Sequence, residues 1–269
     1  MEPARNVLLT GASSGIGAAA AAHLAQRGMA VFGTSRSARD TSPDAQGVHW
    51  LTLDVCDDDS VARAVSAMRA AAGEIDAVVC NAGMGIFGSV EETSLEAARS
   101  QFETNYFGVL RLLRAVLPGM RERGSGRVVL VGSLAGRAPI PFQAHYSSTK
   151  AAIDALALSL RNEVGPLGVG VSLVEPGNID TPFNDAMDWS EGTGSAYAER
   201  IARCEAEIRE QLGKAPGPAV VARAIEHALT ARRPRVRYAV GESSWLVPVG
   251  RRLLPDFIAL DLIRRTFRV

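Results

Sequence analysis

Short apolar runs alternate with longer helix-like segments along the chain, and this alternation limits the possible folds more than any other feature. The strand-like runs are residues 5–10, 30–35, 48–53, 75–80, 127–132, 169–174 and 236–240. The helix-like segments cover about 15–28, 58–72, 94–120, 147–164, 196–212 and 217–231. Near-continuous apolar strands separated by helices are typical of a parallel sheet covered on both faces. The pattern predicts an α/β fold with a doubly wound parallel sheet of about seven strands and right-handed crossovers.

The composition narrows the classes of function. The 29 acidic and 29 basic residues balance, so charge gives no support for a nucleic-acid partner. Cys56, Cys80 and Cys204 are widely separated and form no CxxC motif or Cys/His cluster, so neither a disulfide framework nor a metal site is indicated. No apolar run is long enough to span a bilayer, and the first strand-like run begins too early for a signal peptide to precede it. We therefore expect a cytoplasmic protein without a membrane span.

No linker rich in Pro, Gly or Ser divides the chain, so we expect a single domain over residues 1–269. Its least regular stretch, about 182–218, is expected to form a flap over a site, since long loops in compact domains tend to be functional or mobile. The tail, residues 245–269, is amphipathic, with arginines around apolar residues. It could contact a membrane surface, but packing along the site entrance or against a neighbouring subunit is the favoured interpretation.

A glycine-rich stretch, TGASSGIG at residues 10–17, lies between the first strand-like run and the first helix-like segment. Backbone N–H groups at such a turn, with the positive end of the helix, can hold a pyrophosphate. The cofactor-binding residues predicted here are Gly11, Ser13, Ser14, Gly15, Ile16 and Gly17. One alternative is a purely structural glycine turn. Another is a hydrolase with Ser13 as nucleophile, because GASSG fits GxSxG; the motif lies too early for an upstream oxyanion loop, which disfavours it.

Tyr146 and Lys150 are four residues apart in a helix-like segment, so their side chains lie on one face, one turn from each other. A phenol titrates near about 10 in water, so it can both give and take a proton at neutral pH only if a positive charge stabilises the phenolate. Lys150 is one of only two lysines among the 29 basic residues. Its compact ammonium can reach a phenol and a ribose hydroxyl together. The alternative is a pair on an exposed helix face.

Several motifs occur together in one order: TGASSGIG at 10–17, NAG at 81–83, Asn105, Ser133, YSSTK at 146–150 and PG at 176–177. In this combination the chain resembles the short-chain dehydrogenase/reductase family, in its smaller branch, over about residues 5–240. The segments around 102–129 and 166–177 are also similar to hydroxysteroid and retinol dehydrogenases. The resemblance implies a Rossmann-type fold and an oxidoreductase that interconverts a ketone and a secondary alcohol.

The resemblance also implies a role for each of four catalytic residues. Ser133 would hydrogen-bond the substrate carbonyl, and Tyr146 would act as general acid in reduction and as general base in oxidation. Lys150 would lower the pKa of the phenol and bind the nicotinamide ribose. Asn105 would hold a water that links Lys150 to solvent; its alternative is a helix residue that satisfies a neighbouring carbonyl. A dinucleotide-binding regulatory protein without catalysis is the competing function, but all four positions are filled here.

The position of Arg36 indicates NADP(H) rather than NAD(H). An acidic residue about 20 positions past the glycines usually selects NAD by binding the ribose hydroxyls. Here Arg36 stands 19 positions after Gly17, with Arg39 nearby, and a guanidinium can grip a 2′-phosphate. The alternative is a solvated loop arginine.

Further cofactor contacts follow from the resemblance. They are Asp54 and Val55 at the adenine, Asn81, Ala82 and Gly83 beside the ribose, Tyr146 and Lys150, and Pro176, Gly177, Ile179 and Thr181 at the carboxamide. For Asp54, capping of the helix near 58 is almost as good an interpretation.

The substrate site is expected to be apolar, which favours a lipophilic ketone or alcohol. Its expected wall residues are Met84, Phe87, Ile140, Phe142, Phe183, Met187 and Trp189. The alternative is that these side chains only close the flap onto the core. The family resemblance further implies a homodimer or homotetramer formed through the helices at 101–120 and 147–164.

Overall fold

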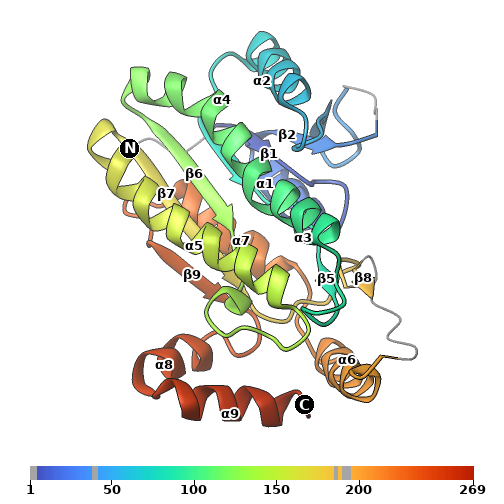
Figure 1. The fold of residues 1–269 in the computed structure, drawn as a ribbon. Coiled ribbons are helices and arrows are strands. Elements are labelled where there is room, and N and C mark those ends of the chain that lie inside the picture. Colours follow the sequence, from blue (N-terminus) through green and yellow to red (C-terminus); the bar gives the residue numbers. More distant parts are fainter. Residues whose placement is uncertain (1–4, 38–41, 185–186, 190–194) are drawn as a thin grey trace.

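The computed structural model describes residues 5–37, 42–184, 187–189 and 195–269 of the chain, with backbone only at 188 and 189. A parallel sheet of seven strands organises the fold, in the order β3-β2-β1-β4-β6-β7-β9 (Figure 1). These strands are β1 (Asn6–Leu9), β2 (Ala30–Ser35), β3 (Val48–Thr52), β4 (Ala77–Cys80), β6 (Gly126–Val131), β7 (Val169–Pro176) and β9 (Arg237–Val240). The predicted doubly wound α/β fold is confirmed.

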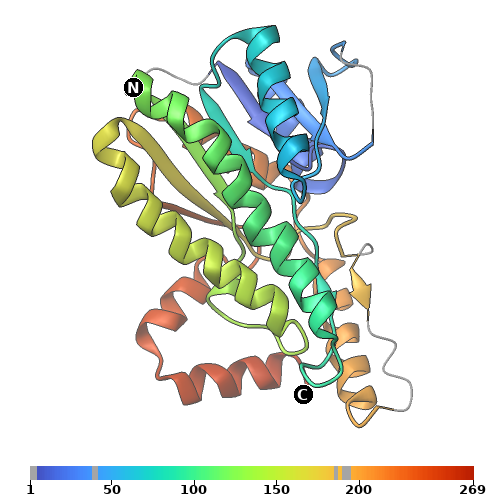
Figure 2. The ribbon, with the colours of Figure 1, turned by 45° about the horizontal axis from the view of Figure 1, so that its top comes forward.

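Helices cover both faces of the sheet. The α-helices of the described residues are α1 (Gly15–Gln26), α2 (Asp58–Ala72), α3 (Leu95–Phe102), α4 (Gly108–Arg123), α5 (Ala144–Val164), α6 (Ala198–Leu212), α7 (Ala219–Thr230), α8 (Leu246–Leu253) and α9 (Asp256–Thr266). Helices α1 and α7 pack together on one face, while α2, α4 and α5 cover the other, where α4 and α5 run side by side (Figure 2).

The burial of β1 shows why residues 7–9 are all apolar. Successive side chains of a strand point to opposite faces of a sheet. Leu8 packs in the core on the α2/α4/α5 side, whereas Val7 and Leu9 pack on the α1/α7 side, and all three have 0% exposure. Burial on both faces therefore favours an apolar residue at each of these three positions.

Three local features differ from the sequence prediction. The helix expected over 94–120 is divided into α3 and α4 by a π-helical turn, Glu103–Phe107. The helix expected from 147 begins at Ala144, so Tyr146 lies inside its first turn. Two short strands, β5 (Ile86–Phe87) and β8 (Asp188–Trp189), pair in parallel beside the main sheet and were not predicted.

The tail forms the two helices α8 and α9, which lie beyond the end of β9 (Figure 1). Within the described ranges, every helix is too short or too polar to cross a membrane.

Candidate active site

A cavity of about 870 Å³ opens at the carboxyl ends of the strands. The strand order reverses between β1 and β4, and in sheets of this type ligands bind at such a switch point. The cavity is lined by the loops that follow β1, β2, β3, β4, β6 and β7, by the start of α5, and by the tail. The topology thus brings the sequence motifs, which are far apart in the chain, to one crevice.

The glycine loop has the shape of a phosphate cradle. Gly11 has φ +67°, and a Cβ there would lie 2.9 Å from the Ala82 Cα. Ser14 is the N-cap of α1, but its side chain makes no capping hydrogen bond, so the first N–H groups of the helix remain available to an anion. Gly11, Ser13, Ser14, Gly15 and Ile16 all line the cavity. These residues fit a dinucleotide pyrophosphate.

Gly17 supports the cradle from behind. It does not line the cavity, and a Cβ at this position would lie 2.0 Å from the Gly11 carbonyl oxygen and 2.6 Å from Asn81 Nδ2. Contacts this short leave no room for any side chain. The predicted role of Gly17 in the loop is therefore one of close packing, with no surface presented to a ligand.

Asn81 and Thr10 join the ends of β1 and β4 beneath the cradle. The Asn81 Nδ2 donates to the carbonyl oxygens of Thr10 and Gly11, at 3.0 and 3.1 Å. The Thr10 hydroxyl accepts from the backbone N–H groups of Asn81 and Ala82, at 3.0 and 3.1 Å. Asn81, Ala82 and Gly83 also line the cavity. Thr10 is the first residue of the TGASSGIG motif and is buried in the structure, and it was not singled out from the sequence. Its position at the end of a strand is the signal that could have revealed its role.

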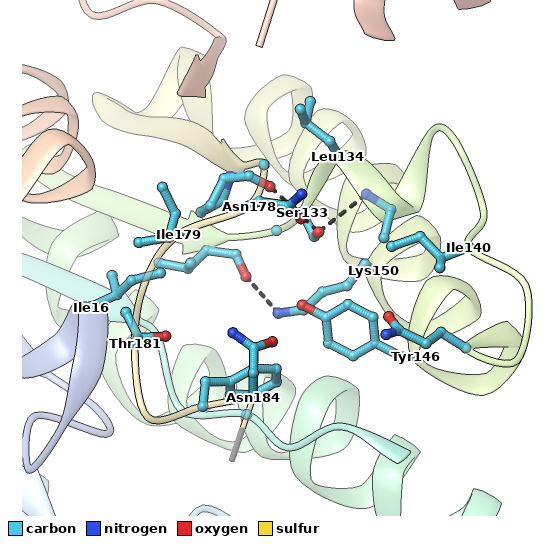
Figure 3. A pocket seen from close by; sticks show the side chains of 18 of the residues that line it. Ile16, Ser133, Leu134, Ile140, Tyr146, Lys150, Asn178, Ile179, Thr181 and Asn184 are labelled. Atoms are coloured by element: carbon cyan, nitrogen blue, oxygen red, sulfur yellow. Dashed lines mark hydrogen bonds between the residues drawn. The ribbon is translucent and has the colours of Figure 1, made fainter. Parts of the chain in front are cut away.

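Tyr146, Lys150 and Ser133 meet at the inner part of the cavity. Tyr146 and Lys150 extend from α5 toward the same point, and Ser133 follows β6 beside them (Figure 3). The Lys150 Nζ lies 5.6 Å from the centroid of the Tyr146 ring and donates to the Val131 carbonyl oxygen at 2.9 Å. The helix face predicted from the four-residue spacing is therefore directed into the cavity rather than toward bulk solvent.

Burial shifts the pKa of both α5 groups. Desolvation raises the pKa of Tyr146 to about 12, and a hydrogen bond with Ser133 acts in the opposite direction. Desolvation lowers the pKa of Lys150 to about 8. The phenol is therefore protonated at neutral pH, as a proton donor must be, and beside this neutral phenol the ammonium loses its proton above about pH 8. Lys150 was expected to lower the pKa of the phenol. In the chain by itself, burial raises that pKa instead.

Asn105 lies behind the cavity wall, in the π-helical turn. Its Oδ1 accepts from Met84 N at 2.8 Å, and its Nδ2 donates to Met84 O at 2.9 Å and to Thr149 Oγ1 at 3.1 Å. The side chain thus satisfies a neighbouring backbone, as the alternative interpretation held. Thr149 receives this bond inside YSSTK, and it was not singled out from the sequence.

Arg36, Asp54 and Val55, the residues predicted to contact the adenosine, line one end of the cavity. The Arg36 side chain is exposed, and no ion pair to it occurs among the residues that the structure describes. Asp54 Oδ1 accepts from Cys56 N at 2.9 Å. The cap of α2 is Asp57, whose Oδ1 accepts from Ser60 N at 3.0 Å, so capping by Asp54 was the wrong alternative. Arg39 lies outside the described residues.

The loop after β7 closes the other side of the cavity. Pro176, Gly177, Ile179 and Thr181, the residues predicted to contact the carboxamide, line it. A Cβ on Gly15 would lie 3.4 Å from the Thr181 Cβ, so this loop reaches the glycine loop. The two loops together enclose the centre of the crevice.

A buried ion cluster supports the same loop and was missed in the sequence. Glu175, at 1% exposure, precedes Pro176 and accepts two 2.6 Å hydrogen bonds from Arg137, which follows Ser133 by one short turn. Arg237 of β9 binds Glu175 at 3.1 Å and also binds Asp154 of α5. The cluster therefore joins the serine loop, α5 and β9. No motif marks it, because its members are widely separated along the chain.

We expect Glu175→Gln to destabilise the protein. The substitution keeps the shape of the side chain but leaves two guanidinium groups without their shared buried carboxylate. Loss of one member of a buried ion pair costs about 3 kcal/mol in the free energy of unfolding, at the low end of the range because both arginines are partly exposed. Urea denaturation followed by circular dichroism measures this. The control, Glu163→Gln at an exposed site on α5, is expected to change the same quantity by less than about 0.5 kcal/mol.

The end of the cavity where the substrate is expected is mostly apolar. Met84, Ile140, Phe183 and Met187 line it as predicted, and the Phe183 and Tyr146 ring centroids are 5.9 Å apart. The side chain of Trp189 lies outside the described residues. The flap contributes through α6, where Gln211 Oε1 accepts from Asn178 Nδ2 at 2.9 Å.

Two predicted wall residues were wrong. Phe87 is fully buried and packs with Ile201, Cys204 and Ile208 of α6, because β5 pairs with β8 and directs this side chain away from the cavity. Phe142 lines a separate small hollow with Tyr197, and its φ of 60° turns the chain at that point.

The tail supplies a wall that the sequence did not define. Its inward-facing residues are Leu246, Val247, Gly250, Arg251 and Leu254 of α8 and its boundary, and Ala259, Leu262, Ile263, Thr266 and Phe267 of α9 and its boundary. The favoured interpretation, packing along the site entrance, agrees with this arrangement.

Comparisons with known proteins agree on one family. A family model described as short chain dehydrogenase matches residues 5–208. A 3-ketodihydrosphingosine reductase of Bacteroides thetaiotaomicron is 36% identical over 87% of each chain. The human 17-beta-hydroxysteroid dehydrogenase type 1 is 34% identical over 93% of this chain and 81% of its own. Among solved structures, a short-chain dehydrogenase from Streptomyces avermitilis is 36% identical, with a TM-score of 0.82 over 97% of this chain and 96% of its own.

Proposed function

The chain belongs to the short-chain dehydrogenase family, a family of oxidoreductases, and we propose that it interconverts a ketone and a secondary alcohol on a lipophilic substrate with NADP(H). The observation that carries this proposal is the meeting of Tyr146, Lys150 and Ser133 in the cavity that also contains the glycine cradle. A protonated phenol, an ammonium and a hydroxyl at one point are suited to polarising a carbonyl and protonating its oxygen.

In this proposal each side chain performs one task. Ser133 orients the substrate oxygen, and Tyr146 donates its proton to that oxygen in reduction or accepts a proton from the alcohol in oxidation. Lys150 provides the positive charge next to the phenolate that oxidation requires. Asn105 fixes the Met84 segment and, through Thr149, the first turn of α5. The proposed water relay at Asn105 completes the path for the proton.

The cavity residues fit a nicotinamide dinucleotide. The glycine loop and the start of α1 would hold its pyrophosphate, Asp54 and Val55 its adenine, Asn81, Ala82 and Gly83 its ribose, and the residues from Pro176 to Thr181 its carboxamide. When bound, the nicotinamide supplies or accepts the hydride. The chain itself supplies the proton and the positions of the reactants.

The cofactor preference is proposed to depend on Arg36, which borders the adenosine end of the cavity with its guanidinium exposed. We expect Arg36→Asp to lower kcat/KM for NADPH by about 10- to 100-fold, because a charge-assisted contact with the 2′-phosphate is replaced by repulsion. Initial rates with NADPH and NADH measure this. Arg63→Asp, on the exposed side of α2, is the control. It should leave the ratio of the initial rates with NADPH and NADH unchanged. Equal wild-type rates with NADH and NADPH would contradict the assignment.

Two observations support a lipophilic substrate. The substrate end of the cavity is lined by apolar side chains of the strand loops, the flap and the tail. The names of the two curated relatives refer to molecules that are mostly hydrocarbon, a ketosphingoid base and a steroid. An apolar cavity with a few polar groups at one end fits a molecule with one reactive oxygen on a hydrocarbon frame.

The proposed function is tested with purified protein and a panel of ketones and secondary alcohols, with NADPH or NADP⁺ and the absorbance of the reduced nicotinamide as the signal. We expect turnover to increase with the hydrocarbon content of the substrate. The competing function, a regulatory protein that binds the dinucleotide without catalysis, requires binding of NADPH with no absorbance change for any substrate.

We further propose a cytoplasmic homodimer or homotetramer formed through α4 and α5. Two apolar side chains are exposed there: Phe107, directly before α4, at 46%, and Leu158, on α5, at 37%. The molar mass in solution, with and without Leu158→Glu, tests this assembly.

A further inference from the structure

The tail has an inner and an outer face, and both are apolar. Its inner face lines the cavity through residues such as Leu254 and Ile263. On the opposite side of α8, Trp245, Val249 and Leu253 follow each other at four-residue spacing and therefore share one face. None of these three residues lines the cavity. A helix that needed only to close the cavity would require one apolar face.

The outer face of the tail is strongly exposed. Trp245, Leu253 and Phe257 have exposed fractions of 72%, 71% and 73%, and Val249 and Leu260 are also exposed. These five residues are called here the outer face of the tail. Helix α8 contains no buried residue, and α9 contains one, Ala259. Large exposed apolar patches on soluble proteins mark surfaces that bind another protein, a membrane or a ligand.

The charge of the tail identifies the kind of partner. The tail contains five arginines and two aspartates; the arginines are Arg251, Arg252, Arg264, Arg265 and Arg268. Both aspartates are already paired, Asp256 with one arginine and Asp261 with two, and Arg268 pairs with Glu207 of α6. Arg252, on α8, has no ion pair within the described part of the chain. Apolar side chains bordered by an excess of arginines are suited to a bilayer surface with anionic headgroups, where arginine stems lie along the apolar layer.

We propose that the outer face of the tail docks onto the surface of an anionic phospholipid bilayer. The same two helices form a wall of the cavity, so docking brings that wall to the membrane, where a lipophilic substrate is concentrated. A second copy of the chain fits this face less well. A twofold contact through the tail would bring two arginine-rich surfaces against each other, and like charges across an interface are unfavourable.

The test is flotation of the full-length protein with vesicles of phosphatidylcholine alone or with about a third phosphatidylglycerol. The wild-type protein is expected to float with the anionic vesicles and to remain mostly unbound with the neutral ones. The triple variant Trp245→Ser, Leu253→Ser, Phe257→Ser should partition at least about tenfold more weakly, because it loses the side chains that enter the acyl boundary. The double variant Arg252→Glu, Arg264→Glu should lose the preference for anionic lipid.

A matched control changes exposed apolar residues elsewhere: Val90→Ser, Leu95→Ser, Leu167→Ser. It should float as the wild type does. Circular dichroism and turnover of a small water-soluble ketone without vesicles show that each variant is folded. This readout also separates docking from the proposed chemistry, since the triple variant should keep its turnover.

Trp245 gives a second signal. Its fluorescence should shift to shorter wavelength with anionic vesicles, and Trp245→Phe should abolish most of that shift while it retains flotation. The proposal is overturned if the wild type does not bind anionic vesicles at low ionic strength, or if the triple variant binds them as the wild type does. It is also overturned if the outer face instead holds two copies of the chain together. The wild type would then be a dimer that does not float with vesicles, and the triple variant would be a monomer.

Discussion

Tyr146→Phe is expected to reduce kcat by about 10²- to 10⁴-fold in either direction, because the substitution removes the group that transfers the proton. The ring remains, so its contact with Phe183 and the shape of the cavity are preserved. Affinity for NADPH should therefore change by less than about twofold. Steady-state rates give the first quantity, and quenching or enhancement of NADPH fluorescence on titration gives the second.

The matched control is Tyr197→Phe. This tyrosine also loses only a hydroxyl, which in the wild type donates to Glu91 at 2.7 Å on the surface. Its kcat should remain within about twofold of the wild type, since surface contacts of this kind contribute little. If Tyr146→Phe retained more than about a tenth of the wild-type turnover, Tyr146 would not be the proton donor, and another group of the cavity would have to take that role.

Lys150→Met is expected to have the second-largest effect, a loss of about 10²-fold or more in kcat/KM. Methionine has nearly the same length as lysine but carries neither the charge beside Tyr146 nor the donor that binds Val131 O at 2.9 Å. Both contact with the cofactor ribose and stabilisation of the phenolate should be lost. The control is Lys214→Met, which replaces the other lysine of the chain, at an exposed i,i+4 pair with Glu210, and should leave turnover unchanged.

The stability of the same variant distinguishes a catalytic lysine from a structural one. Burial lowers the pKa of Lys150 in the folded chain to about 8, from an ordinary value of 10.5. Between these two pH values the unfolded chain binds more protons, so the contribution of Lys150 to stability rises with pH and is least favourable below about pH 8. Lys150→Met removes this unfavourable contribution. We expect the variant at pH 7 to be at least as stable to urea as the wild type, and its advantage to shrink from pH 8 to 10.

The fold was predictable because the inner strands of the sheet are buried on both sides. The runs at 127–132 and 169–174 are almost wholly apolar, and they become β6 and β7, two strands that have a neighbour on each side. Motifs directly after such runs must lie at the carboxyl edge, since parallel strands all end there. Ser133 after β6 and Pro176 at the end of β7 are examples, and both line the cavity.

The remaining features depend on interactions that a linear pattern does not contain. The π-helical turn at Glu103–Phe107 is a change of backbone hydrogen-bond register inside an otherwise continuous helical pattern. Phe87 and Ile140 are equally apolar in the sequence, and only the pairing of β5 with β8 decides that Phe87 enters the core. The cluster around Glu175 joins elements that are far apart in the chain. Glu175 and Arg237, for example, are 62 residues apart.

Lys150 illustrates the limit for the site itself. Its spacing from Tyr146 correctly predicted a shared helix face, but not its bond to Val131 O or the desolvation that raises the pKa of the phenol. A helical repeat specifies direction, whereas a pKa depends on everything that surrounds the group in three dimensions. The sequence does not determine how strongly the ammonium lowers the pKa of the phenol, so this effect is the most useful one to measure.

That measurement is the ionisation of the Tyr146 phenol by ultraviolet difference absorbance, with Tyr146→Phe as the blank and NADP⁺ at saturation. Wild type and Lys150→Met are titrated over the pH range in which circular dichroism shows both to be folded. We predict that the phenol of the wild type titrates about 1–3 pH units below that of Lys150→Met, because the phenolate and the Lys150 ammonium stabilise each other's charge and so titrate as a coupled pair. The same pKa in both proteins would contradict it.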